Sequence, residues 1–390
     1  MYKKILALII VSVFLTIALI PEALTQENDK KEERTLIKTE GSGGTIVLNN
    51  TILKVFIQNE TGSTGVGTYT IATAENHPTP NEDVFFAGAA GSPWSTYTTI
   101  HVVSTKRDYI TSTDTGIKPS ISGYTVVHMD DLGHIIVLQT DRRVMIKWTT
   151  YEGLEVYQDI ELLGTTVEDT KVRISVYVKN NNESSLVFGI RYEWDIMIDG
   201  EDGSWFRPWI DLNTPGTWTD VETQYDNPQF VFWETTNDPA SPVLFEYGSV
   251  SEPSTLTPAP TPPDNITFAA WGFDPSPGLY NCTWNFTVQE RTIAGFGLDS
   301  AVAYFWMPKE IAHGGWYNVT AYLFGVSPTP TPTPTPTVPS VGGEVETQLP
   351  VRGAEALIAL FVVLTILAAL VVLENYLKRN LIFLILLLHK

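Results

Sequence analysis

The chain has 390 residues, a formal net charge of −20 and a sequence pI near 4.6. Most of its surface would repel a polyanion, which argues against nucleic acid as a partner. Its single cysteine excludes an intramolecular disulfide, so a folded domain of this size must be stabilised by its own core.

Residues 1–25 have the pattern of a secretory signal peptide. Two lysines precede an apolar stretch over 5–20, and Pro21 ends it shortly before the expected cleavage point at Thr25. Because threonine is unusual there, an uncleaved anchor is the alternative. Both interpretations export the following chain. Residues 26–40 are mostly charged or polar and predict a flexible leader.

From 41 to 326 the dominant hydrophobic period is two. The segments 97–103, 154–162 and 171–178 alternate in this way, with turn residues between them. Many short strands of this kind predict an all-β fold, a large antiparallel β-sandwich in one domain. The Pro-rich segment 253–263 is expected to be an exposed loop inserted in that sandwich, and a boundary between two domains is the alternative.

Seven Asn-x-Ser/Thr acceptors for N-linked glycans lie in this predicted ectodomain. They are Asn49, Asn59, Asn182, Asn265, Asn281, Asn285 and Asn318. We expect 281–288 to be a strand, which would turn both of its asparagines outward and bury Cys282 as an inert core thiol.

An acidic segment after the middle of the chain carries the candidate chemistry. Glu193, Asp195 and Asp199 are weak catalytic candidates, since a pair of carboxyl groups can serve as acid and base. No cofactor is required, although Asp195, Asp199, Glu201 and Asp202 would suit Ca²⁺, which prefers oxygen ligands. Acidic residues that only begin a turn are the alternative explanation.

A second candidate site is aromatic. Trp205, Arg207, Trp209 and Trp218 lie close together in sequence, near acidic residues. Such a mixture suits stacking on sugar rings, with polar groups bonding hydroxyls. The alternative is that these tryptophans pack in the core.

The C-terminal part predicts a tethered protein. Residues 327–353 form a Thr/Pro-rich stalk and linker, for which polyproline II is expected. A transmembrane helix is expected over 354–377, where the apolar run Ala356 to Leu373 would reach about 27 Å and contact membrane lipid. The basic and apolar tail 378–390 would be cytoplasmic by the positive-inside rule, which leaves the ectodomain outside the cell membrane.

Four segments support a resemblance. Ser95–Ile100, Phe188–Asp195, Asp199–Phe206 and Asp299–Trp306 resemble motifs of uncharacterised, mainly archaeal, membrane-anchored surface proteins. The ectodomain of those proteins is similar to the galactose-mutarotase-like β-supersandwich, so the resemblance implies that fold. Mutarotases use histidine and glutamate at the sugar site, and no such set matches positions here.

Two functions follow as hypotheses. The first is a non-catalytic, glycosylated surface protein of archaeal type that is part of the cell envelope or binds glycans or envelope proteins. The second is a carbohydrate-active ectoenzyme, of glycosidase, epimerase or lyase type, on a mutarotase-like sandwich.

Overall fold

A computed structural model of the protein describes residues 44–80, 83–85, 93–198, 200–251, 256–272 and 277–326. All of them fall in the first of two units, Met1–Thr329 and Pro330–Lys390. The predicted signal peptide, leader, stalk, transmembrane helix and tail lie outside the described residues. Within the described part of the chain, no helix has the length and hydropathy needed to cross a membrane.

Two sheets make up the described fold, which confirms the all-β prediction. The eleven-stranded sheet contains β1 (Thr45–Asn49), β2 (Leu53–Gln58), β3 (Tyr69–Thr73), β4 (Asp83–Phe85), β5 (Tyr97–Val102), β6 (Arg107–Ile110), β7 (Thr125–His128), β12 (Leu186–Ile196), β15 (Thr223–Asp226), β18 (Asn265–Ala270) and β19 (Ser300–Ile311). Its pairs are antiparallel, except that β6 and β7 are parallel.

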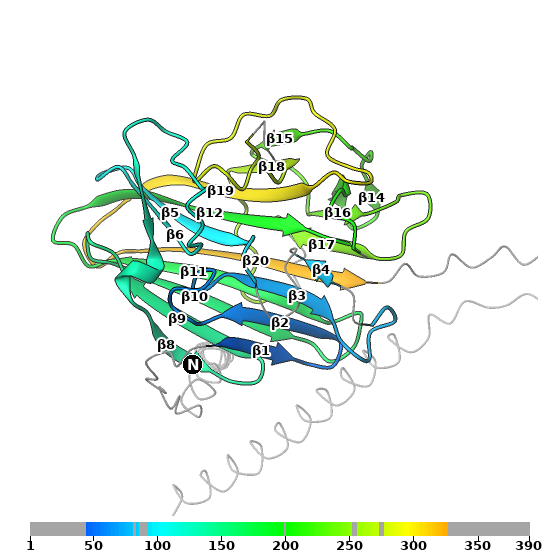
Figure 1. Ribbon diagram of the computed structural model, residues 1–390, viewed down its shortest axis with the longest axis horizontal. Coiled ribbons are helices and arrows are strands. Elements are labelled where there is room, and N and C mark those ends of the chain that lie inside the picture. The colour runs from blue at the N-terminus through cyan, green and yellow to red at the C-terminus, as the bar shows by residue number, and fades with distance from the viewer. Residues whose placement is uncertain are drawn as a thin grey trace, which may run out of the picture. The chain divides into compact units, whose positions relative to one another are not determined.

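The second sheet has nine strands, all paired antiparallel, in the order β14-β13-β16-β17-β20-β11-β10-β9-β8. They are β8 (Ile135–Gln139), β9 (Arg143–Thr149), β10 (Leu154–Leu163), β11 (Lys171–Asn180), β13 (Trp205–Asp211), β14 (Thr214–Pro215), β16 (Phe232–Thr236), β17 (Phe245–Ser249) and β20 (Trp316–Val326). A single turn of 3-10 helix, η1 (Met129–Leu132), leads from β7 in the first sheet to β8 in the second. In Figure 1, β1–β3 overlie β9–β11 of the nine-stranded sheet.

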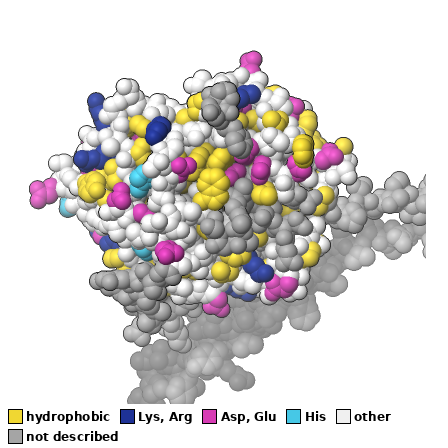
Figure 2. Space-filling model, in the orientation of Figure 1, with side chains coloured by type: hydrophobic (Ala, Val, Ile, Leu, Met, Phe, Trp, Pro, Cys, Tyr) yellow, Lys and Arg dark blue, Asp and Glu magenta, His cyan; other side chains and the backbone are white. Residues whose placement is uncertain are grey.

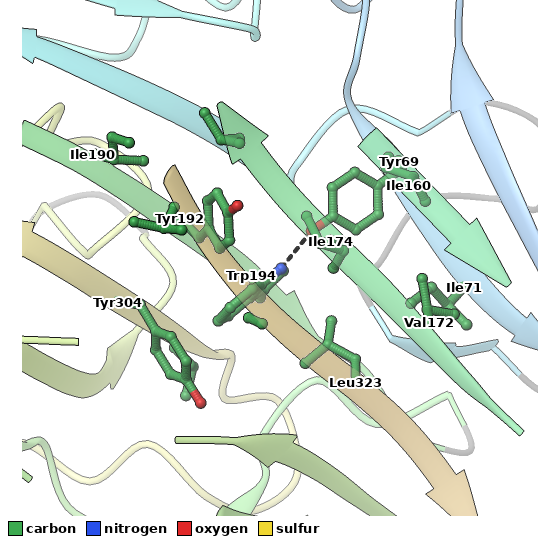
Figure 3. Close-up of a cluster of buried hydrophobic side chains, with 14 of the residues drawn as sticks. Tyr69, Ile71, Ile160, Val172, Ile174, Ile190, Tyr192, Trp194, Tyr304 and Leu323 are labelled. Atoms are coloured by element: carbon green, nitrogen blue, oxygen red, sulfur yellow. Dashed lines mark hydrogen bonds between the residues drawn. The ribbon is translucent and has the colours of Figure 1, made fainter. Parts of the chain in front are cut away.

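The main core lies between the two sheets, because alternation turns one side of each strand inward. In β12, Ile190, Tyr192 and Trp194 face Ile174 and other aliphatic side chains of β10, β11 and β20 (Figure 3). The indole Nε1 of Trp194 donates a hydrogen bond to the hydroxyl of Tyr69, 2.5 Å away, so the N–H of this buried ring is hydrogen-bonded.

A second, smaller core covers the far side of the eleven-stranded sheet. There Leu279, Tyr280 and Trp284, from a segment without regular structure, pack on side chains such as Ala301 and Phe305 of β19. Residues on the outer side of β12 are consequently as buried as those on its inner side. This second layer creates the enclosed environment of the candidate site.

The strand expected over 281–288 is absent, so that expectation is wrong. Asn281 is half-buried, and its side-chain oxygen accepts a hydrogen bond from the backbone N–H of Gly278, while Trp284 is held by stacking on His101, 4.4 Å between ring centres. Burial raises the pKa of the half-buried Cys282 thiol, which agrees with an unreactive cysteine.

The seven glycan acceptors differ in exposure. Asn49, Asn285 and Asn318 are exposed, Asn182 and Asn281 are half-buried, and Asn59 and Asn265 are buried. On the face shown in Figure 2, Asp and Glu side chains are spread over most of the surface, as expected from the net charge.

Candidate active site

The outer side of β12 carries a row of ionisable side chains. Arg191, Glu193 and Asp195 alternate with core residues, so all three point away from the main core and lie under the second one. The strand lies between β5 and β19, which fixes its register: Glu193 is opposite Tyr97 of β5 and Ala303 of β19. The row is therefore held on the middle of a sheet.

Arg191 is fixed by Tyr97 of β5 and by Leu279 of the irregular segment that carries Leu279, Tyr280 and Trp284, here called the covering segment. Its guanidinium donates to the hydroxyl of Tyr97 and to the carbonyl of Leu279, each at 2.8 Å, and lies 5.2 Å from the centre of the Tyr97 ring. The Tyr97 hydroxyl in turn lies 2.8 Å from the carbonyl oxygens of Tyr280 and Cys282. Arg191 thus ties β12 to the covering segment.

Glu193 and Asp195 are buried without matching partners. Among the described residues, neither carboxyl oxygen of Glu193 has a hydrogen-bond partner, and nor does Oδ1 of Asp195. The opposing side chains on β19 are Ala303 and Ala301, which offer no polar group. Ser95 gives Asp195 one hydrogen bond. Buried polar groups are normally paired, so this strand keeps two carboxyl groups at a free-energy cost.

Two further carboxyl groups lie near them. Asp202 follows β12 after a tight turn, and Asp299 immediately precedes β19. Ser300 joins the two segments: its backbone N–H and hydroxyl both donate to the carbonyl of Asp202, at 2.9 and 2.8 Å. We call Glu193, Asp195, Asp202 and Asp299 the carboxyl cluster.

Burial and mutual repulsion keep protons on this cluster. Burial, followed by repulsion from Asp202, raises the pKa of Asp299 to about 8. Burial also raises the pKa of Asp195 well above its ordinary value, and repulsion from Asp299 adds to it. For Glu193, burial raises the pKa while nearby Arg191 opposes the rise. Carboxyl groups whose pKa values are raised in this way keep their protons near neutral pH, the state required of a general acid.

An aromatic group borders the cluster. The backbone N–H of Trp271 donates to the carbonyl of Asp299 at 3.2 Å, and the Trp271 ring stacks on Tyr280 with centres 4.4 Å apart. Trp94, next to Ser95, meets the Trp271 ring edge-on at 5.3 Å and is 38% exposed. Trp94 therefore reaches the surface, whereas Trp271, 8% exposed, is buried against Tyr280 in the second core.

The structure brings together only part of the predicted acidic set. Glu193, Asp195 and Asp202 join the cluster, whereas Glu201 is half-exposed in the turn and Asp199 lies outside the described residues. The described part of the chain holds no group of three or more His, Cys, Asp or Glu side chains able to hold a metal ion. Calcium binding that involves Asp199 stays a prediction.

The predicted aromatic set is on the other sheet. Trp205, Arg207 and Trp209 point outward from β13 of the nine-stranded sheet, and Trp218 follows β14. The Arg207 guanidinium lies 4.3 Å from the centre of the Trp218 ring and 5.2 Å from that of Trp209. Arg207, Trp209 and Trp218 therefore do gather, but away from the core and on a different sheet from the carboxyl cluster.

Asp299 and Trp271 were not identified from the sequence as site residues. They reach the site through the pairing of β19 with β18, about 30 to 40 positions away, and with β12, more than 100 positions away, which no local pattern reveals. The available signal was weak: an acidic residue directly before the alternating strand 300–306.

Comparison with known proteins gives fold neighbours only. No known family model matches the chain, and no curated protein matches it. Similar solved structures include a putative aldose 1-epimerase from Escherichia coli K12 (TM-score 0.43, 11% identity, 73% of this chain and 100% of that chain). A galactose mutarotase related enzyme from Lactobacillus acidophilus has TM-score 0.43, 9% identity and coverage of 73% and 98%. The GalM/aldose epimerase homologue from C. elegans has TM-score 0.43, 11% identity and coverage of 73% and 99%.

These neighbours are mutarotase-like and aldose 1-epimerase proteins, the fold group that the sequence resemblance named. Likeness of this degree assigns no activity to the chain. Any functional conclusion must come from its own residues.

Proposed function

We propose that this protein is carbohydrate-active, with the carboxyl cluster as its acid–base centre and the exposed ring of Trp94 as the surface on which a sugar ring stacks. This is the second of the two hypotheses from the sequence. The non-catalytic surface role gains no support from the described geometry, since a binding module has no need for buried carboxyl groups without partners.

One observation carries the proposal: Glu193 and Asp195 are fully buried on a rigid central strand, and three of their four carboxyl oxygens have no partner among the described residues. Unpaired buried groups reduce stability, so their retention points to a role in chemistry. Asp299, with its pKa near 8, supplies a proton donor at neutral pH.

The reaction class follows from these groups. Breaking a bond at the acetal carbon of a sugar requires a proton for the departing oxygen and a base for the incoming water or hydroxyl. A protonated carboxyl group of the cluster supplies the first, and the carboxylate that remains after it has given up its proton then accepts the second. The exposed indole of Trp94 would pack against the apolar face of the sugar ring.

The test is a screen of the purified full-length protein on chromogenic glycosides, on reducing sugars by optical rotation, and on polysaccharides by release of reducing ends. We expect turnover, and about 10²- to 10⁴-fold less of it in Asp195→Asn and Glu193→Gln. Asp238→Asn, an exposed change in the loop between β16 and β17, is the matched control. Equal turnover in all three variants would contradict the proposal.

We also propose that the site works outside the cell membrane. The support is the sequence pattern alone: the signal-like 1–25, the stalk 327–353 and the apolar run Ala356 to Leu373. Protease added to intact cells should then remove the domain, and survival of the domain under conditions that digest a known surface protein would contradict this topology.

A further inference from the structure

We propose a second, non-catalytic site on the outer face of the nine-stranded sheet, which binds a neutral polysaccharide. We call it the aromatic platform, and its rings are Trp209, Trp218, Phe232, Phe245, Tyr247 and Phe324. It lies on the sheet that does not carry the carboxyl cluster, so binding there is independent of the proposed acid–base chemistry.

Strand register builds the platform. β13, β16, β17 and β20 are consecutive neighbours, and Arg207, Glu234, Tyr247 and Phe324 lie opposite one another in a single row across them. Adjacent strands are about 4.8 Å apart, so the row extends about 14 Å. Side chains one position further along, such as Phe206 and Trp233, face the main core instead. The row therefore stands on the outer side of the sheet and is long enough for more than one sugar ring.

The rings are arranged in facing pairs. Trp209 stacks on Phe232 with centres 5.2 Å apart, and Tyr247 on Phe324 also at 5.2 Å. Trp218 lies parallel to Phe245 at 6.4 Å. All of these side chains are half-buried rather than enclosed, so each keeps part of its surface exposed to solvent. Flat, partly exposed rings are suited to the apolar faces of pyranose rings.

A buried glutamate holds the platform in place. Glu234 is 1% exposed; it accepts hydrogen bonds from the indole of Trp209 at 3.0 Å and the hydroxyl of Tyr247 at 2.7 Å, and pairs with Arg207. The guanidinium of Arg207 then packs against the rings of Trp209 and Trp218. Three donors on one carboxylate fix the orientation of the rings before any ligand arrives, which reduces the entropy lost on binding.

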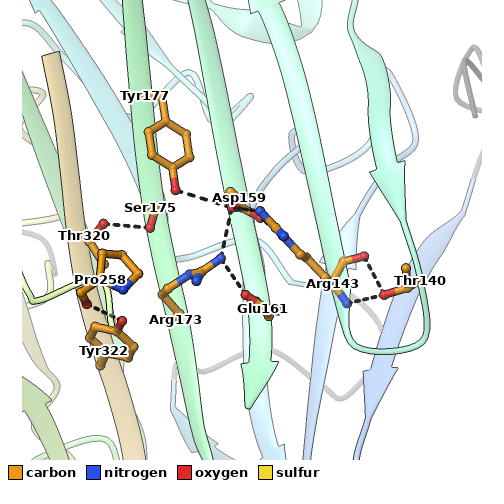
Figure 4. A network of polar contacts seen from close by, with 10 residues as sticks. All are labelled: Thr140, Arg143, Asp159, Glu161, Arg173, Ser175, Tyr177, Pro258, Thr320 and Tyr322. Carbon is orange, nitrogen blue, oxygen red and sulfur yellow. Dashed lines mark hydrogen bonds and ion pairs between the residues drawn. The ribbon is translucent and has the colours of Figure 1, made fainter. Parts of the chain in front are cut away.

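Charge pairing selects a neutral ligand. Arg207 is neutralised by Glu234, so the platform offers no free positive charge to an acidic sugar. Further along the same face, toward β8, Arg143 and Arg173 are also paired, with Asp159 and Glu161 (Figure 4). With a net charge of −20, the chain would repel anionic polymers.

The proposal can be tested by affinity gel electrophoresis of the full-length protein. The gels would contain a soluble neutral polysaccharide: β-glucan, galactan, mannan or starch. At least one should retard the wild type, and Trp218→Ala and Trp209→Ala should each weaken that binding about tenfold or more, with Trp218→Phe restoring most of it. Trp316→Ala is the matched control, because Trp316 is 49% exposed on the same face but lies tilted against Tyr157, away from the platform.

Thermal melting confirms that each variant is folded; Trp218 follows β14 outside the central strands, so its variants should melt as the wild type does. Three results would overturn the proposal. The first is that none of the four polymers retards the wild type, and the second is that Trp316→Ala weakens binding as much as Trp218→Ala does. The third is that Trp218→Ala loses self-association of the protein and not sugar binding. Asp195→Asn should leave retardation unchanged, and Trp218→Ala should leave turnover of small glycosides unchanged. Failure of the platform and failure of the acid–base centre are thereby distinguishable.

Discussion

Raising the pH should destabilise the folded protein through Asp299. The pKa of this carboxyl group rises from 3.8 to about 8 in the folded state, chiefly through burial. Below pH 3.8 the group is protonated in both states, and its contribution to stability is fully present. Between that value and about 8 the unfolded chain releases the proton while the folded chain keeps it, so the free energy of unfolding falls as the pH rises.

The size of this effect can be bounded. A shift from 3.8 to about 8, at about 1.4 kcal/mol per unit, would amount to about 6 kcal/mol. Asp299 is only partly enclosed, and solvent screening reduces the figure, so we expect about 2 kcal/mol. Removing the charge by Asp299→Asn should therefore leave stability nearly unchanged at pH 4.5 and raise it by about 2 kcal/mol at pH 8.5.

Urea denaturation of wild type and variant at pH 4.5, 6.5 and 8.5 measures this difference. Comparison with the variant is essential because two histidines also make stability depend on pH. Burial lowers the pKa of His77 and of His134, so their contributions to stability fall as the pH drops below about 6.5. This change is opposite in direction to the one expected from Asp299. Those contributions are the same in both proteins and cancel. A difference that stays constant across the three pH values, or that grows toward acid, would refute the reasoning.

Three more predictions concern packing and modification. Gly248→Ala should cost about 2 kcal/mol or more, measured by urea denaturation, because the added Cβ would lie 2.3 Å from the Trp233 ring. Trp194→Ala should cost about 3–5 kcal/mol, since it empties a core site and removes the hydrogen bond from the Trp194 indole to the Tyr69 hydroxyl; a loss below 1 kcal/mol would argue against this packing. Peptide mapping of protein from its native host should find N-linked glycan only at exposed acceptors and never at the two buried ones; the exposed set is Asn49, Asn285 and Asn318, and the buried set is Asn59 and Asn265.

Local alternation was enough to predict several strands, among them those found over 97–102, 154–163 and 171–180. In β10 and β11 ten consecutive residue pairs match, Leu154 opposite Asn180 through Leu163 opposite Lys171, because each strand carries a continuous apolar side. The same rule placed Glu193 and Asp195 on one side of a strand. What it could not supply was the identity of the neighbours on the next strand, which depends on a β12–β19 pairing of residues about 100 positions apart.

In the segment 281–288, by contrast, alternation predicted a strand that the structure does not contain. Its residues alternate as a strand would, yet tertiary contacts decide its conformation. Lys118 forms an isolated bridge with Cys282, and Trp284 lies against the His101 ring. A period of two over eight residues reflects one buried side, and a covering loop can produce that pattern without a strand.

Strand β12 carries both core residues that stabilise the fold and carboxyl groups that reduce its stability. Its inner side chains, Tyr192 and Trp194, contribute to the main core. On its outer side, three of the four carboxyl oxygens of Glu193 and Asp195 have no hydrogen-bond partner in the part of the chain that the structure describes. A fold selected only for stability would replace those two carboxyl groups with apolar residues, which the surrounding alanines and aromatics could readily accommodate. Replacement of Asp195 by an apolar residue should therefore stabilise the fold while reducing turnover, and this trade-off between stability and activity is expected where a protein retains unfavourable groups for chemistry.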